Sequence, residues 1–187
     1  MKLQMAKSRL GVDIDGVLNS LYLSLAKLVK KYFELKVDTS HYDIYDQIGL
    51  TESEWYKFLD EHYDEMTINA ENKCQYYLQQ LKKNYDIYII TARPYEFAQA
   101  TIQWLKDQNI YYDDILFKSG NKVDACKFID VKYMIDDSPW NIHALNREKI
   151  NCLIFDRPYN QTVKDTEFIQ RVYNWNDIFT ICNKQGD

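Results

Sequence analysis

Two carboxylates at the end of an apolar run near the N-terminus, Asp13 and Asp15, have the type and spacing to do chemistry. The run predicts a buried strand over 9–13, and alternate side chains of a strand lie on the same face. Because two close like charges repel, a cation must lie between them or one must hold a proton, and Mg²⁺ with oxygen ligands is the usual solution. The alternative is a calcium loop or an acidic turn, but Ile14 and Gly16 break the spacing of an EF-hand loop.

A second strand, predicted over 85–90, ends in Thr91, which Ala92, Arg93 and Pro94 follow. Pro94 favours the first turn of a helix, and apolar residues at helical spacing continue it. A hydroxyl and the backbone N–H groups after it favour phosphate at such a helix N-terminus. A threonine here is also a common β-former or helix cap, and capping or a surface ion pair is the alternative for Arg93.

Fixed positive charge near these acids is expected from one of Lys118, Lys122 and Lys127. Lys118 and Lys122 lie between a short strand predicted over 115–117 and a helix predicted over 123–128, and Lys127 lies within that helix. Dense carboxylates cannot hold an anionic phosphate without such a charge. An exposed lysine without a function is the alternative for each.

A further strand, predicted over 133–135, ends in Asp136 and Asp137. Ser138 and Pro139 then fit the N-cap and the first position of a helix. Ligands of an open α/β sheet bind at the carboxyl ends of its strands. We therefore expect this acidic strand end and the first one to meet in one crevice.

These strand ends must be positioned by a sheet whose strands alternate with helices. The alternation predicts a Rossmann-like α/β fold, with a parallel sheet, right-handed crossovers and helices on both faces. The expected strands are residues 9–13, 85–90, 115–117, 133–135 and 150–155.

The stretch between the first two strands, residues 17–84, has helical periodicity. Apolar residues recur on one face over 17–33, Thr51 and Glu54 form a capping box, and a third helix is expected over 68–83. A helical insertion directly after the first strand is placed to cover the site as a lid. The predicted division is a core of residues 1–16 and 85–187 and a helical cap of residues 17–84.

Composition narrows the class of protein. The chain has 187 residues and a net charge of −5, without a basic run, which argues against stable nucleic-acid binding. No signal segment or apolar run of bilayer length is present, so a cytoplasmic protein without a membrane partner is expected. The scattered cysteines fit neither a zinc site nor a disulfide framework, and the histidines have no metal-ligand spacing.

The order of the motifs resembles that of the haloacid dehalogenase-like (HAD) phosphohydrolases, with Asp13-Ile14-Asp15-Gly16, Thr91, Lys122 and Asp136-Asp137 in place. Within this superfamily the chain is most similar to the 5'(3')-deoxyribonucleotidase family, over nearly its whole length. The similarity includes the stretches Thr91-Ala92-Arg93-Pro94, Phe155-Asp156-Arg157-Pro158-Tyr159-Asn160 and Val172-Tyr173-Asn174-Trp175. Two departures are Ala92, where the family often has serine, and a longer stretch over 122–136, which keeps Lys118 as the rival of Lys122.

The resemblance implies a role for each motif. Asp13 would be the nucleophile, and Asp15 would be the general acid and base, with its backbone carbonyl binding the metal. Asp136 would be a carboxylate ligand of Mg²⁺, and Asp137 would orient the metal shell or the lysine. The phosphate would be held by Thr91, Ala92 and Lys122.

The expected cap carries aromatic residues that could stack on a base, although at helical spacing they are also typical of a core. These are Tyr22, Tyr45, Trp55, Tyr56 and Phe58. The resulting hypothesis is an Mg²⁺-dependent phosphomonoesterase of the 5'-nucleotidase type that acts on deoxyribonucleoside monophosphates, with homodimer formation left open. The alternatives are a phosphatase for another small ester, a 3'-phosphatase for nucleic-acid ends, and a non-catalytic phosphate-binding regulatory domain.

Overall fold

A six-stranded parallel sheet forms the centre of the protein in the computed structural model, which describes residues 6–62, 68–117 and 122–184. The strand order is β3-β2-β1-β4-β5-β6, and all neighbours are parallel. This confirms the predicted fold class. The strands are β1 (Ser8–Val12), β2 (Tyr85–Ile90), β3 (Asp114–Leu116), β4 (Tyr133–Asp136), β5 (Cys152–Phe155) and β6 (Ile169–Val172).

Helices cover both faces of the sheet, as the alternation of strands and helices predicts. Along β5, Leu153 and Phe155 pack in one apolar cluster and Cys152 and Ile154 in the other, because successive side chains of a strand point to opposite faces. The first face carries α4 (Cys74–Leu81), α5 (Ala98–Asp107) and α8 (Trp175–Asn183), and the second carries α6 (Lys122–Ile129) and α7 (Pro139–Arg147). Short 3₁₀ turns are η2 (Tyr95–Phe97) and η3 (Pro158–Asn160).

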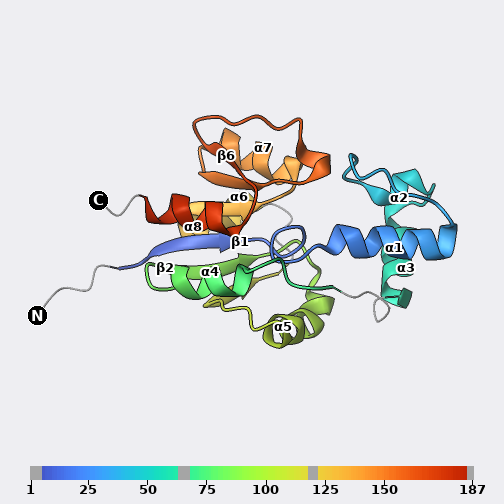
Figure 1. Ribbon diagram of the computed structural model, residues 1–187, viewed down its shortest axis with the longest axis horizontal. Coiled ribbons are helices and arrows are strands. Elements are labelled where there is room, and N and C mark those ends of the chain that lie inside the picture. Colours follow the sequence, from blue (N-terminus) through green and yellow to red (C-terminus); the bar gives the residue numbers. More distant parts are fainter. Residues whose placement is uncertain (1–5, 63–67, 118–121, 185–187) are drawn as a thin grey trace, which may run out of the picture.

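A separate group of helices lies beyond one end of the sheet, at the right of Figure 1. It comprises α1 (Leu21–Phe33), α2 (Ile44–Gln47) and α3 (Glu52–His62), which surround an apolar cluster of their own. The predicted capping box of α3 is confirmed, because Thr51 N donates to Glu54 Oε2 at 2.8 Å and Glu54 N donates to Thr51 Oγ1 at 3.3 Å. These three helices, α1–α3, form the cap.

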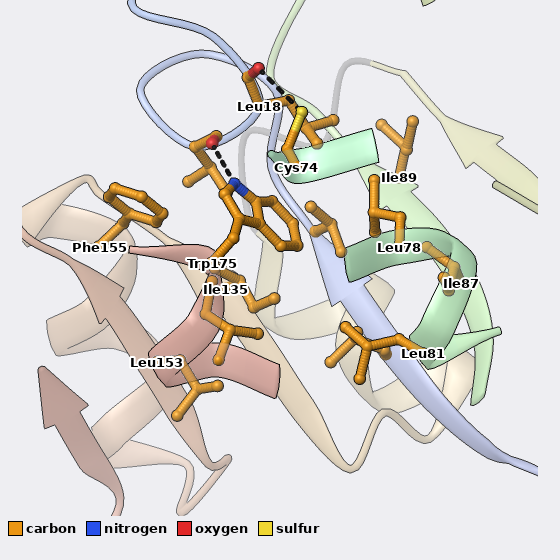
Figure 2. Packing of buried hydrophobic residues seen from close by; sticks show 14 of the residues in the cluster. Leu18, Cys74, Leu78, Leu81, Ile87, Ile89, Ile135, Leu153, Phe155 and Trp175 are labelled. Atoms are coloured by element: carbon orange, nitrogen blue, oxygen red, sulfur yellow. Dashed lines mark hydrogen bonds between the residues drawn. The ribbon is translucent and has the colours of Figure 1, made fainter. Parts of the chain in front are cut away.

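The third helix predicted in the insertion, α4, is shorter than expected and packs against the sheet rather than against the cap. Cys74, Leu78 and Leu81 belong to the same buried cluster as Trp175 of α8 (Figure 2). The helix is therefore part of the layer that covers the sheet. The division of the chain at 17–84 stays a prediction.

The segment between β1 and α1 is a tight turn and not the start of a helix. The carbonyl of Ile14 accepts hydrogen bonds from the backbone N–H groups of the turn, and α1 begins only at Leu21. The Trp175 indole donates to Val17 O at 3.3 Å, one of the two dashed contacts in Figure 2. A buried side chain of the last helix thus holds the turn that follows the first acidic motif.

Two further features concern the cysteines and the apolarity of the helices. The four cysteines are free and buried, in agreement with the absence of a disulfide framework. Among the described residues, no helix is long and apolar enough to cross a bilayer.

Candidate active site at the carboxyl ends of the central strands

The two acidic strand ends lie next to each other. Strand β1 pairs with β4, and the strand order reverses between them, which is where open α/β sheets bind ligands. Asp13 N donates to Ile135 O at 3.0 Å, so the segment after β1 continues along β4. One carboxylate oxygen from each of Asp13, Asp136 and Asp137 lies within 4.8 Å of the other two. The expected convergence of the acidic strand ends is therefore present.

Lys122, at the start of α6, lies between two of these acids. Its Nζ is 2.7 Å from Asp13 Oδ2 and 2.7 Å from Asp136 Oδ2, and its side chain is 1% exposed. Burial raises the pKa of Asp13 to about 7, against the lowering effect of the Lys122 charge. The rival residue, Lys118, lies outside the described residues.

The carboxylate of Asp136 is held by the helix that follows it. Oδ1 accepts a hydrogen bond from Ser138 N at 2.8 Å, and Asn141 Nδ2 lies 3.1 Å from Oδ2. Ser138 is the N-cap of α7 and Pro139 its first residue, as predicted. Asn141 is not among the residues predicted from the sequence. Its only signal there is an amide in the first turn of the helix after an acidic strand end.

Asp137 is held by a different set of groups. Its Oδ2 accepts a hydrogen bond from the Tyr159 hydroxyl, and Asn160 Nδ2 donates to its backbone carbonyl at 2.9 Å. Burial and the nearby charges of Asp136 and Asp13 raise the pKa of Asp137 well above its usual value. Tyr159 is a further residue that the motif pattern does not reveal, because it lies after β5, far from the acids in sequence.

Gly16 is required by this arrangement. Its φ is +77°, and a Cβ atom there would lie 1.9 Å from Asp137 Oδ2. Any side chain at this position would displace the carboxylate. The glycine of the first motif therefore lets the turn after β1 approach the acid after β4.

The donor set fits a hard divalent cation. Asp13, Asp136 and Asp137 offer buried carboxylate oxygens, which Mg²⁺ prefers over nitrogen or sulfur. In the described part of the chain, Lys122 pairs with Asp13 and Asp136, and no ion pair reaches Asp137. The excess of negative charge is the feature that a cation would compensate.

Asp15 lies outside this carboxylate cluster and pairs with Arg93. Arg93 Nη2 is 2.6 Å from Asp15 Oδ1, and Nε donates to Oδ2 at 2.8 Å. Burial would raise the pKa of Asp15, but the Arg93 charge and hydrogen bonds, with a further bond from Asn19, lower it overall. The interpretation of Arg93 as a cap or a surface ion pair is wrong, because its side chain is 11% exposed and faces the motif acid.

Thr91 and Ala92 lie at the end of β2 beside this pair. Thr91 is buried, and its Oγ1 accepts a hydrogen bond from Arg93 N at 3.2 Å. Ala92 is exposed and lines the same cavity as Thr91. The predicted phosphate-binding residues are thus adjacent to the acids.

A cavity of about 370 Å³ lies between this polar edge and the cap. Four of the predicted cap aromatics line it: Tyr22, Tyr45, Trp55 and Tyr56. Phe58 is not among its lining residues, and its ring contacts Trp55 and residues of α1 within the cap. The cavity is also lined by residues not predicted from the sequence, among them Tyr42, Asp43, Glu52 and Asn141.

Comparisons with known proteins agree with this architecture. The family model described as "5' nucleotidase, deoxy (Pyrimidine), cytosolic type C protein" matches residues 7–185. YqfW of Bacillus subtilis (strain 168), which is described as a candidate nucleotidase, is 30% identical over an alignment of 176 residues, and the match covers 89% of this chain and 89% of its own. A 5'(3')-deoxyribonucleotidase of Clostridium acetobutylicum is 24% identical over 98% of this chain and 99% of its own.

Solved structures show the same fold. The haloacid dehalogenase-like hydrolase SP0104 of Streptococcus pneumoniae has a TM-score of 0.68 at 15% identity, over 94% of this chain and 98% of its own.

Proposed function

The chain belongs to the 5' nucleotidase, deoxy (pyrimidine), cytosolic type C family of the haloacid dehalogenase-like superfamily, and we propose that it is an Mg²⁺-dependent nucleotidase preferring deoxyribonucleoside monophosphates. The observation that carries the proposal is the buried group of Asp13, Lys122, Asp136 and Asp137, which meets the cap across one cavity. The cavity is large enough for a small ligand. We place the enzyme in the cytoplasm, acting on free nucleotides.

In the proposed reaction, a carboxylate oxygen of Asp13 attacks the phosphorus of the ester in line. The bond between phosphorus and the ester oxygen breaks, and Asp15, which enters this step protonated, donates its proton to the departing alkoxide. Water then attacks the aspartyl-phosphate while Asp15 takes its proton, which releases inorganic phosphate and restores Asp13. Covalent catalysis of this kind divides one difficult displacement into two easier ones.

Lys122 and Thr91 would hold the non-bridging phosphate oxygens. Lys122 is already fixed by Asp13 and Asp136, so its charge needs no reorganisation when the phosphate arrives. Ala92 would contribute its backbone N–H beside Thr91. Mg²⁺, held by Asp13, Asp136 and the Asp15 backbone carbonyl, would neutralise charge on the phosphate, with Asp137 supporting the metal shell.

The cap wall would select the nucleoside. Tyr22, Tyr45, Trp55 and Tyr56 line the cavity that the acids face. Aromatic faces stack on bases, and each such contact contributes about 1–3 kcal/mol. The family match to nucleotidases supports a base as the ligand of this wall.

An assay of phosphate release tests the proposal. Deoxyribonucleoside, ribonucleoside and sugar monophosphates would be compared with and without Mg²⁺, for the wild type and for Asp13→Asn. We expect Mg²⁺-dependent turnover that is highest for deoxyribonucleotides, and a loss of about 10³-fold or more in Asp13→Asn. Asp156→Asn is the control, because this acid follows β5, pairs with Arg171 and does not line the cavity.

Each alternative has its own outcome in this assay. Equal turnover of sugar phosphates would overturn the nucleotide assignment in favour of a general phosphatase. Preferential release of phosphate from the 3' end of an oligonucleotide would identify a nucleic-acid phosphatase. No Mg²⁺-dependent turnover of any ester would point to a phosphate-binding regulatory domain.

A further inference from the structure

The ion pair between Arg93 and Asp15 has the geometry of a clamp. Two nitrogens on one edge of the guanidinium reach the two carboxylate oxygens, Nε at 2.8 Å and Nη2 at 2.6 Å. A bidentate contact of this kind fixes the plane of the carboxylate as well as its position. A surface ion pair between flexible side chains would not do this.

Arg93 is itself held in place by two threonines. Its Nη1 donates to Thr101 Oγ1 of α5 at 3.1 Å, and its backbone N donates to Thr91 Oγ1 at 3.2 Å. Both threonines are buried, with at most 1% exposed. The clamp is therefore anchored to the end of β2 and to α5, two elements of the core.

A third donor approaches Asp15 from the segment that leads to the cap. Asn19 Nδ2 donates to Asp15 Oδ1 at 3.0 Å, while Asn19 Oδ1 accepts from Gly16 N and Leu21 N. A carboxylate has about four acceptor positions, so the donors from Arg93 and Asn19 leave roughly one for another partner. The remaining position is on Oδ2, because Oδ1 already accepts from Arg93 Nη2 and Asn19 Nδ2. It would carry the proton that Asp15 gives to the leaving-group oxygen or takes from water.

We propose that Arg93 is a positioning residue that aims the Asp15 carboxyl group, protonated for this step, at the leaving-group oxygen. The inference rests on the proposed function, in which Asp15 transfers the proton. General acid catalysis requires hydrogen-bond distance to the accepting oxygen, and a displacement of about 1 Å can cost roughly 10²-fold in rate. Arg93 acts through Asp15, because the guanidinium nitrogens Nε, Nη1 and Nη2 are all engaged with Asp15 and Thr101.

The experiment compares two esters that differ in their need for a proton. A deoxyribonucleoside monophosphate releases an alkoxide that must be protonated, whereas p-nitrophenyl phosphate releases an anion that is stable without a proton. Because Asp15 also activates water in the second step, which is common to both esters, the first step is compared through kcat/KM. In Arg93→Met we expect kcat/KM for the nucleotide to fall by about 10-fold to 100-fold, and kcat/KM for p-nitrophenyl phosphate by less than about 3-fold. Arg93→Lys keeps the charge but loses the second contact, so it should recover only part of the nucleotide rate.

Arg171→Met is the matched control for loss of a partly buried arginine. The Arg171–Asp156 pair has side-chain exposures of 11% and 30%, against 11% and 29% for Arg93–Asp15, and Arg171 does not line the cavity. This variant should lower thermal stability without changing the ratio of the two rates. Circular dichroism and thermal unfolding show which variants fold. If Arg93→Met fails to fold, Arg93→Lys provides the test.

A double variant decides between positioning and direct phosphate binding. In an Asp15→Asn background, a residue that acts through Asp15 has no further effect, so adding Arg93→Met should change kcat by less than about 2-fold. If KM instead rises for both esters and in both backgrounds, Arg93 binds phosphate itself and the inference is overturned. A wild type without turnover on either ester would instead overturn the proposed function.

Discussion

The two walls of the cavity are built in opposite ways. The wall at the ends of β1 and β4 is polar, and each acid in it is held by identified donors, such as Lys122 for Asp13 and Ser138 for Asp136. The wall formed by the cap is aromatic, and its helices pack around their own cluster rather than on the sheet. Under the proposed function, this difference assigns the reaction chemistry to the sheet edge and the selection of the ligand to the cap.

The largest effect is expected when the positive charge of the polar wall is removed. In Lys122→Met, Asp13 and Asp136 lose the cation that lies 2.7 Å from each. Turnover should fall by about 10²-fold to 10³-fold, because a preorganised charge is lost. Folding stability should fall by about 3–5 kcal/mol, the cost of breaking a buried ion pair.

Kinetics and urea unfolding measure both effects of Lys122→Met. Lys127→Met, on the same helix, is the control, because the Lys127–Glu148 pair is exposed and contributes at most about 1 kcal/mol. Equal effects of the two substitutions on turnover and stability would contradict the special role of the buried Lys122 charge in the polar wall.

Substitution of a glycine tests whether the polar wall depends on close backbone approach. In Gly16→Ala, the added Cβ would lie 1.9 Å from Asp137 Oδ2, at a φ of +77°. We expect a loss of about 1–3 kcal/mol in stability, together with a loss of activity. Gly49→Ala, at a φ of +71° with no atom within 4 Å of the new Cβ, should lose stability alone. Activity assays and thermal unfolding separate the two.

A smaller effect is expected in the aromatic wall. Two aromatic residues of α3 differ in their surroundings, so their substitution distinguishes contact with the ligand from packing within the cap. Tyr56 lines the cavity and is 51% exposed, whereas Phe58 packs within the cap. Tyr56→Leu should raise KM for nucleotides by about 5-fold or more through lost stacking, with little change in stability. Phe58→Leu should lower stability by about 1–2 kcal/mol with KM unchanged. The reverse pattern in steady-state kinetics and unfolding would show that the cavity wall is assigned wrongly.

The smallest effect concerns the capping box at the start of α3. Thr51→Ala removes the Oγ1 acceptor of Glu54 N and the hydroxyl that donates to Glu54 Oε2 at 2.7 Å. We expect a loss of about 1 kcal/mol in stability with kcat unchanged. Unfolding monitored by circular dichroism measures it, and a fall in kcat would mean that cap stability limits the reaction.

Elements with a strong local pattern could be predicted from the sequence. The strand over 85–90 has the expected bounds, since an apolar run reports directly on burial, and the helix after Ser138 begins at Pro139 as expected. The strand β6 has no such signal, because it is short and carries Gln170 and Arg171. The helix α4 shows a second limit of prediction from the sequence. Its amphipathic face indicates that one side of the helix is buried, but not which element covers that side.

The sequence by itself determined that Asp13 and Asp15 end one strand and that Asp136 and Asp137 end another, because the end of a strand is a property of neighbouring residues. It also determined that the strands are parallel, because strands alternate with helices along the chain. Only the tertiary structure decided that Arg93 clamps Asp15, that Tyr159 holds Asp137, and that Tyr56 rather than Phe58 faces the cavity. Such contacts join residues far apart in the chain or distinguish faces of one helix. They depend on how whole layers pack, which residue spacing does not encode.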